Sequence, residues 1–86
     1  METEENIMTL FFTNDSKQKR KLAVSSVAED LFYEMEMFLE EHRINPHFIE
    51  VSPEGKVSFG SMTEHFIIEN YSNNALDQFR RLFREA

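Results

Sequence analysis

The chain contains no cysteine and no tryptophan, and only two glycines and two prolines among its 86 residues. The absence of cysteine excludes disulfides, thiolate nucleophiles and every zinc site that uses a cysteine ligand. Gly55 and Gly60 are too few for a glycine-rich phosphate loop. No apolar run approaches the roughly 18 residues of a membrane-spanning helix. We therefore expect no membrane segment, and a small protein without disulfides is typical of the cytoplasm.

Hydrophobic residues make up 41% of the chain and include nine phenylalanines, which is enough apolar material for a folded core. The length suits a single domain spanning residues 1–86. The net charge is −7, with 16 acidic residues against nine lysines and arginines. We expect residues 1–5, which are rich in glutamate, to be disordered. A core this small leaves a narrow stability margin, so pairing with a second copy as a homodimer stays open.

The first apolar segment, residues 7–13, is short and rich in residues that favour strands. Turn-forming residues follow it, and residues 19–24 then alternate charged and apolar side chains. These features predict a hairpin with its basic residues on the open side of the sheet.

Ser26 followed by Glu29 matches a capping box, in which the two side chains satisfy free backbone donors at the start of a helix. The helix should end near residues 43–45, because Pro46 disfavours helical geometry in the residue before it. On a helical wheel the apolar side chains fall within an arc of about 140°. They are Val27, Ala28, Leu31, Phe32, Met35, Phe38 and Leu39, joined by His42.

Residues 48–51 and 56–60 flank a Ser-Pro-Glu-Gly turn and predict a second hairpin. For residues 64–71 we predict a strand, because Phe66, Ile67 and Ile68 favour β-structure. The alternative is a helix that begins with a capping box of Ser61 and Glu64.

The last segment predicts a short amphipathic helix capped by Asn73 or Asn74. Its apolar face consists of Ala75, Leu76, Phe79, Leu82 and Phe83. The predicted order is therefore ββαβββα. This order indicates an α+β fold in which two helices cover one face of an antiparallel sheet of about five strands.

No catalytic or cofactor motif accompanies this fold. His42 and His47 are separated by Pro46 and by a spacing that does not suit a zinc site, and His65 has no partner visible in the sequence. We expect His42 to pack or to cap the end of the helix. A ligand cavity of roughly 300 Å³ or more would also hollow out so small a core. We therefore expect no metal, no cofactor and no enzyme activity.

One feature indicates a binding surface. Tyr33 and Met37 lie one helical turn apart on the face opposite the apolar arc. Acidic residues flank this pair on both sides: Glu29, Glu36 and Glu40 on one, and Asp30, Glu34 and Glu41 on the other. Large apolar side chains inside a charged rim are typical of protein interfaces. The alternative is that other parts of the chain cover the pair and that Arg80, Arg81 and Arg84 neutralise the acids.

A second cluster has the opposite charge and consists of Lys17, Lys19, Arg20 and Lys21. Beside Phe11 and Phe12 it could form a basic and aromatic platform for single-stranded nucleic acid. The net charge of −7 repels phosphates, so direct nucleic-acid binding is the alternative interpretation.

The sequence thus predicts a small acidic binding protein that acts stoichiometrically on a protein partner with a basic surface. In size and charge it resembles phage-borne inhibitors such as anti-CRISPR and anti-restriction proteins. That resemblance implies an inhibitor or modulator of a nucleic-acid-handling protein, whose phosphate groove the acidic side chains would occupy.

Overall fold

The computed structural model describes residues 7–14, 18–61 and 63–85. The expectation of disorder at residues 1–5 and the candidate residue Lys17 both lie outside these ranges. Within them, no helix has the length and apolar character needed to cross a membrane.

Five strands and two helices follow one another in the predicted order ββαβββα. The strands are β1 (Met8–Thr13), β2 (Lys19–Ser25), β3 (Glu50–Val51), β4 (Lys56–Ser58) and β5 (His65–Glu69). The helices are α1 (Ala28–Glu41) and α2 (Asn73–Glu85). The predicted α+β fold class is therefore confirmed, and residues 64–71 contain a strand rather than the alternative helix.

All neighbouring strands pair antiparallel, in the spatial order β2-β1-β5-β4-β3. The β1–β2 pairing contains an irregularity: Leu10 pairs with Ala23, Phe11 pairs with Lys21, and Leu22 is the additional residue. This bulge changes the face to which the following side chains point.

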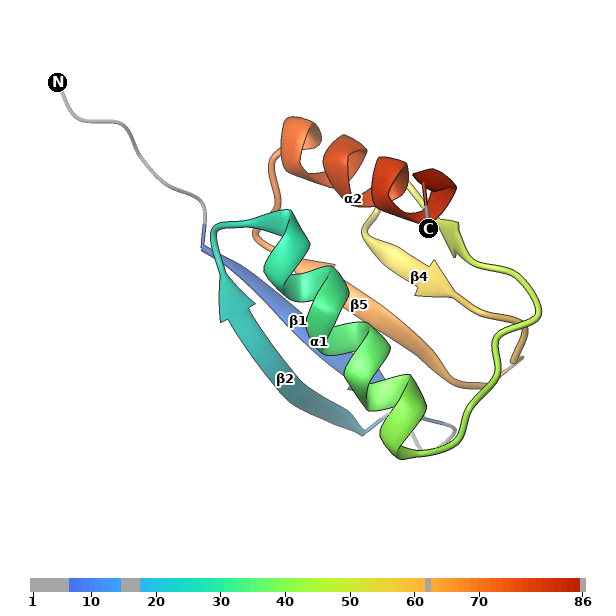
Figure 1. The fold of residues 1–86 in the computed structure, drawn as a ribbon. Helices are drawn as coiled ribbons and strands as arrows, with labels where there is room; N and C mark the ends of the chain where they lie inside the picture. The colour runs from blue at the N-terminus through green and yellow to red at the C-terminus, as the bar shows by residue number, and fades with distance from the viewer. Residues whose placement is uncertain (1–6, 15–17, 62, 86) are drawn as a thin grey trace, which may run out of the picture.

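Both helices lie on the same side of the sheet (Figure 1). Alternate residues of the strands point toward them and form a core with the apolar arc of α1. Phe66 on β5 is fully buried and contacts rings from three other segments: Phe12, Phe38 and Phe59. Phe79 joins α2 to the same core through Phe32 of α1, with ring centroids 6.0 Å apart.

The second hairpin is shorter than predicted, since β3 contains only two residues and the Phe48 side chain is 52% exposed before it. The turn itself is as expected. Gly55 has a φ of +85° and donates its N–H to the Ser52 carbonyl oxygen at 3.0 Å. A Cβ at Gly55 would lie 2.5 Å from the Ile68 carbonyl oxygen, so the turn and its contact with β5 both need glycine.

The predicted helix caps are wrong in detail. Helix α1 has Val27 at its N-cap position and no side-chain cap hydrogen bond, so the capping box of Ser26 and Glu29 does not form. The Ser25 hydroxyl accepts the Val27 N–H at 3.0 Å and donates to Asp30 at 2.9 Å. In α2 the Ser72 hydroxyl, rather than Asn73 or Asn74, accepts the Ala75 N–H at 3.1 Å. Adjacent serine and asparagine residues suit a cap equally well, and the chain direction before the helix selects one of them.

Candidate partner-binding surface

The outer face of α1 places two large apolar side chains in solvent. Tyr33 is 61% exposed and Met37 is 45% exposed, while Ala28, Leu31, Met35, Phe38 and Leu39 on the inner face are buried. No described part of the chain seals Tyr33 or Met37. We call Tyr33, Met37 and the six acids around them the α1 surface.

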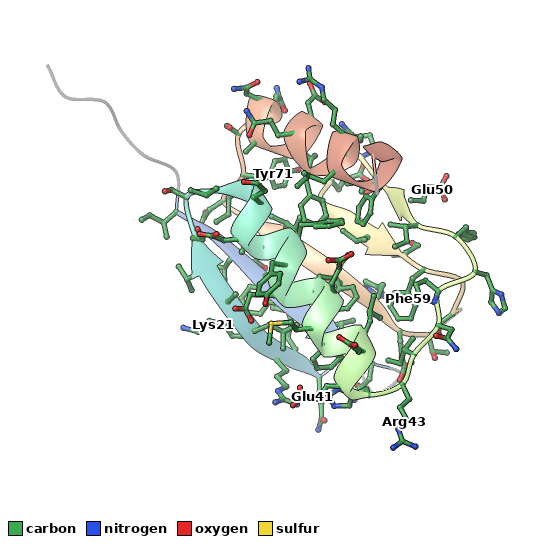
Figure 2. All side chains as sticks on the ribbon, in the orientation of Figure 1. Lys21, Glu41, Arg43, Glu50, Phe59 and Tyr71 are labelled. Atoms are coloured by element: carbon green, nitrogen blue, oxygen red, sulfur yellow. The ribbon has the colours of Figure 1, made fainter. Side chains whose placement is uncertain are left out.

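The acids of the α1 surface are all exposed. They are Glu29, Asp30, Glu34, Glu36, Glu40 and Glu41, and Figure 2 labels Glu41 at the last turn of the helix. Among the described residues, none of these six carboxylates forms an ion pair. Arg80 does not neutralise these acids, which was the alternative considered from the sequence. It binds Asp77 at 2.8 Å and the Val51 carbonyl oxygen at 3.3 Å instead.

Several of these charges work against the helix that carries them. Asp30 with Glu34, and Glu36 with Glu40, are like-charge pairs four residues apart, which cost about 0.2–0.5 kcal/mol each in isolated helices. Glu40 and Glu41 lie at the C-terminal end of α1, whose last turn contains no basic residue. A negative charge there opposes the helix dipole by about 0.3–1 kcal/mol. Glu29 and Asp30 in the first turn suit the helix dipole, whereas Glu34, Glu36, Glu40 and Glu41 add no stability that would explain their position on this helix.

A small cavity of about 170 Å³ separates α1 from β2 at the edge of this surface. Met37 and Phe38 from α1 and Leu22 from β2 supply its apolar part, and Glu34, Glu41 and Arg20 line its rim. The cavity gives an apolar side chain of a partner a place beside Met37.

The described residues of the basic cluster, Lys19, Arg20 and Lys21, lie on two different faces of the sheet. Residues paired across neighbouring strands share a face of the sheet, and Arg20 pairs with Phe12, which packs against Phe38 of α1. The Arg20 guanidinium carbon lies 5.8 Å from the centre of the Phe38 ring. Lys19 and Lys21 point to the opposite face, which no helix covers in the described structure. The same alternation separates Phe11 from Phe12.

The helix-free face, which we call the open face, also contains residues that the sequence analysis missed. Lys56 and Ile67 pair across β4 and β5, and Ile67 pairs with Phe11 of β1. The Lys19 ammonium lies 4.5 Å from the centre of the Phe11 ring and 2.6 Å from Glu69. These residues come from distant segments, so only the strand order brings them together.

His65 also belongs to the open face, where it pairs with Ser58 and Thr13. Burial, and secondly the positive charge of Lys56, lower the pKa of its side chain below 6.5. The folded protein therefore favours the neutral form of His65.

His42 has the packing role expected from the sequence. Its ring stacks on Phe38 with centroids 4.1 Å apart, and its Nδ1 lies 3.1 Å from the Phe38 carbonyl oxygen. Among the residues that the structure describes, no group of three or more histidine, aspartate or glutamate side chains is placed to hold a metal ion.

No protein-family model, no curated protein and no solved structure matches this chain.

Proposed function

We propose that this protein is a non-catalytic, stoichiometric binding protein that docks on a basic surface of a cytoplasmic protein partner through the α1 surface. The observation that carries the proposal is the exposure of Tyr33 and Met37 within a rim of six acids that form no ion pair with other described residues. Apolar side chains at the centre of an interface supply affinity, and charges at the rim steer the partner.

The stability cost of Glu40 and Glu41 supports the same proposal. Glu40 and Glu41 at the negative end of α1 oppose folding, and a cationic partner would relieve that repulsion on binding. The more specific form of the proposal is an inhibitor or modulator of a nucleic-acid-handling protein, of the phage anti-CRISPR or anti-restriction kind. Such a partner offers a groove lined with lysine and arginine, to which the carboxylates would bind in place of phosphates.

The proposal is tested by affinity capture with the wild-type chain and with a Tyr33→Ala, Met37→Ala double variant, followed by calorimetry on each captured protein. The double variant should weaken binding by roughly 2 kcal/mol or more and keep its cooperative melting. The matched control is Asn74→Ala on α2, an exposed residue outside the α1 surface. A partner that binds the double variant and the wild type equally well would refute this use of the α1 surface.

A second candidate function is nucleic-acid binding by the open face. Lys19, Lys21 and Lys56 point to this face, with Phe11 and Ile67 between them, and lysines around an aromatic ring suit a single strand. Binding of labelled oligonucleotides at physiological salt, abolished by Lys19→Ala with Lys56→Ala and unaffected by Tyr33→Ala with Met37→Ala, would favour this candidate over the α1 surface.

A further inference from the structure

A second cavity, of about 500 Å³, opens where α1 ends beside the end of the β1–β2 hairpin. It is bounded by β1, β2, the end of α1 and the segment before β5. Its volume lies within the range of about 300–1,000 Å³ that is usual for small-molecule sites. No residue of the α1 surface lines it, and neither Lys19 nor Lys21 does. The cavity shares Arg20 and Phe38 with the 170 Å³ cavity beside Met37, so it adjoins the α1 surface without including any of its residues.

One wall of the cavity is a stack of rings. Phe38 lies between Phe12, whose centroid is 4.6 Å away, and His42, whose centroid is 4.1 Å away at an interplanar angle of 25°. Phe38 is buried, whereas His42 is exposed at the mouth. A flat ligand can extend this stack with little loss of side-chain freedom, because the rings are already fixed against each other.

Two side chains of opposite charge line the same cavity and form no ion pair with each other. Arg20 enters from β2, and Glu64 enters from the segment before β5. Neither side chain forms a hydrogen bond or an ion pair with another described residue. A guanidinium offers only donors and an ionised carboxylate only acceptors. A ligand that bridges them therefore presents an acceptor or anionic group to Arg20 and N–H donors to Glu64.

The His42 ring adds an acceptor. Its Nδ1 lies 3.1 Å from the Phe38 carbonyl oxygen, which only accepts hydrogen bonds, so Nδ1 carries the proton. In the neutral ring, Nε2 is then left as an acceptor for a ligand. The side-chain amide of Gln18, which also lines the cavity, can donate or accept.

We propose that this cavity binds a guanine nucleotide, either free or as an unpaired residue of a nucleic-acid strand. The base stacks on the exposed His42 ring, which itself stacks on Phe38. Its Watson–Crick edge faces Glu64, and its phosphate binds Arg20. Guanine is preferred because its N1–H and N2 amino group are adjacent donors that suit the two oxygens of a carboxylate. The other bases place an acceptor beside each donor on this edge, and an acceptor is repelled by Glu64.

The test is titration calorimetry of the whole chain with GMP, AMP, CMP, UMP and inorganic phosphate. GMP should bind at least tenfold more tightly than each of the other four. Glu64→Gln should weaken GMP binding at least tenfold and remove the preference over AMP. Arg20→Gln should weaken GMP and AMP alike. Matched controls on the open face, Lys21→Gln and Glu69→Gln, should leave GMP binding unchanged, and thermal melting should show that all four variants fold.

The source of the nucleotide is distinguished by adding two short oligonucleotides, one with a single guanine and one with none. Tighter binding of the guanine oligonucleotide than of GMP identifies a strand as the ligand, and the reverse identifies a free nucleotide. The proposal is overturned by the absence of saturable binding for GMP and both oligonucleotides, by equal binding of the four nucleotides, or by loss of binding in the Lys21→Gln control. The Tyr33→Ala, Met37→Ala variant should bind GMP as the wild type does. A chain that fails to bind GMP would therefore not contradict the proposed role of the α1 surface.

Discussion

The two helices differ in how they use their charges. On α2, Arg80 binds Asp77 and also donates to the Val51 carbonyl oxygen, which ties the helix to β3. On α1, six exposed carboxylates have no ion-pair partner among the described residues. Both helices bury an apolar face in the same core. The difference indicates that Arg80 and Asp77 on α2 contribute to the fold, whereas the acids of α1 other than Asp30, which accepts a hydrogen bond from Ser25, are free to contact another molecule.

The largest loss of folding stability should come from a substitution in the core that both helices share. Phe79→Ala should lower the free energy of unfolding by about 3–5 kcal/mol, because a buried ring that packs on Phe32 of α1 and on Phe83 of its own helix is lost. Tyr33→Ala on the outer face of α1 should change it by less than about 0.5 kcal/mol. Urea denaturation measures both values. A loss of several kcal/mol in Tyr33→Ala would place that ring in the core and remove the basis of the comparison.

Neutralising one acid on each helix tests whether the charges of α1 and α2 affect folding stability in opposite directions. Glu40→Gln should raise the free energy of unfolding by about 0.5 kcal/mol, since it removes repulsion from Glu36 and an unfavourable interaction with the helix dipole. Asp77→Asn should lower it by about 0.3–0.5 kcal/mol, because Arg80 loses its ion pair. The measurement is chemical denaturation at low ionic strength. If both substitutions raise the free energy of unfolding, or both lower it, the charges on the two helices affect stability in the same way.

Charge reversal separates steering from packing on the α1 surface. Glu36→Lys with Glu40→Lys should slow association with a basic partner by roughly tenfold and reduce its salt dependence, while Tyr33→Ala with Met37→Ala should mainly speed dissociation. Stopped-flow or surface plasmon resonance at two salt concentrations distinguishes the rates. If both pairs change only the dissociation rate, the acids belong to the contact and do not steer.

The smallest expected change is in the pH dependence of folding stability, through His65 on the open face. Because the pKa of His65 is lowered in the folded state, the unfolded chain takes up this proton more readily as pH falls. The stability that His65 contributes is therefore complete above a pH of about 6.5 and is lost as the pH falls below it. His65→Gln should flatten the dependence of unfolding on pH between 7 and 5. The Tyr33→Ala, Met37→Ala variant should keep the wild-type dependence.

Local patterns in the sequence predict most of the fold. The period of the apolar residues gives both helices, and the same period predicts that Tyr33 and Met37 face outward. The cap of α2 is missed because Ser72 and Asn73 have nearly equal local chemistry. The cap of α1 is missed because the helix begins after Val27, which has no capping side chain. The length of β3 is also missed, since pairing with β4 and not composition decides where it begins.

The tertiary surfaces could not be predicted from neighbouring residues. The sequence places Arg20 with Lys19 and Lys21, yet strand alternation sends Arg20 to the helix side. Lys56 joins the open face only through the pairing of β4 with β5. The cavity between Arg20 and Glu64 likewise needs the strand order, because the two residues are far apart in the chain. The role of the α1 surface in binding stays a prediction.

Amide NMR on the labelled chain maps the footprint of a captured partner and shows whether the α1 surface binds it. The account predicts that the largest shifts occur at Tyr33, Met37 and the acids beside them on α1, while α2 and the open face stay unchanged. Shifts concentrated on the open face, around Phe11, Lys56 and Ile67, would contradict it.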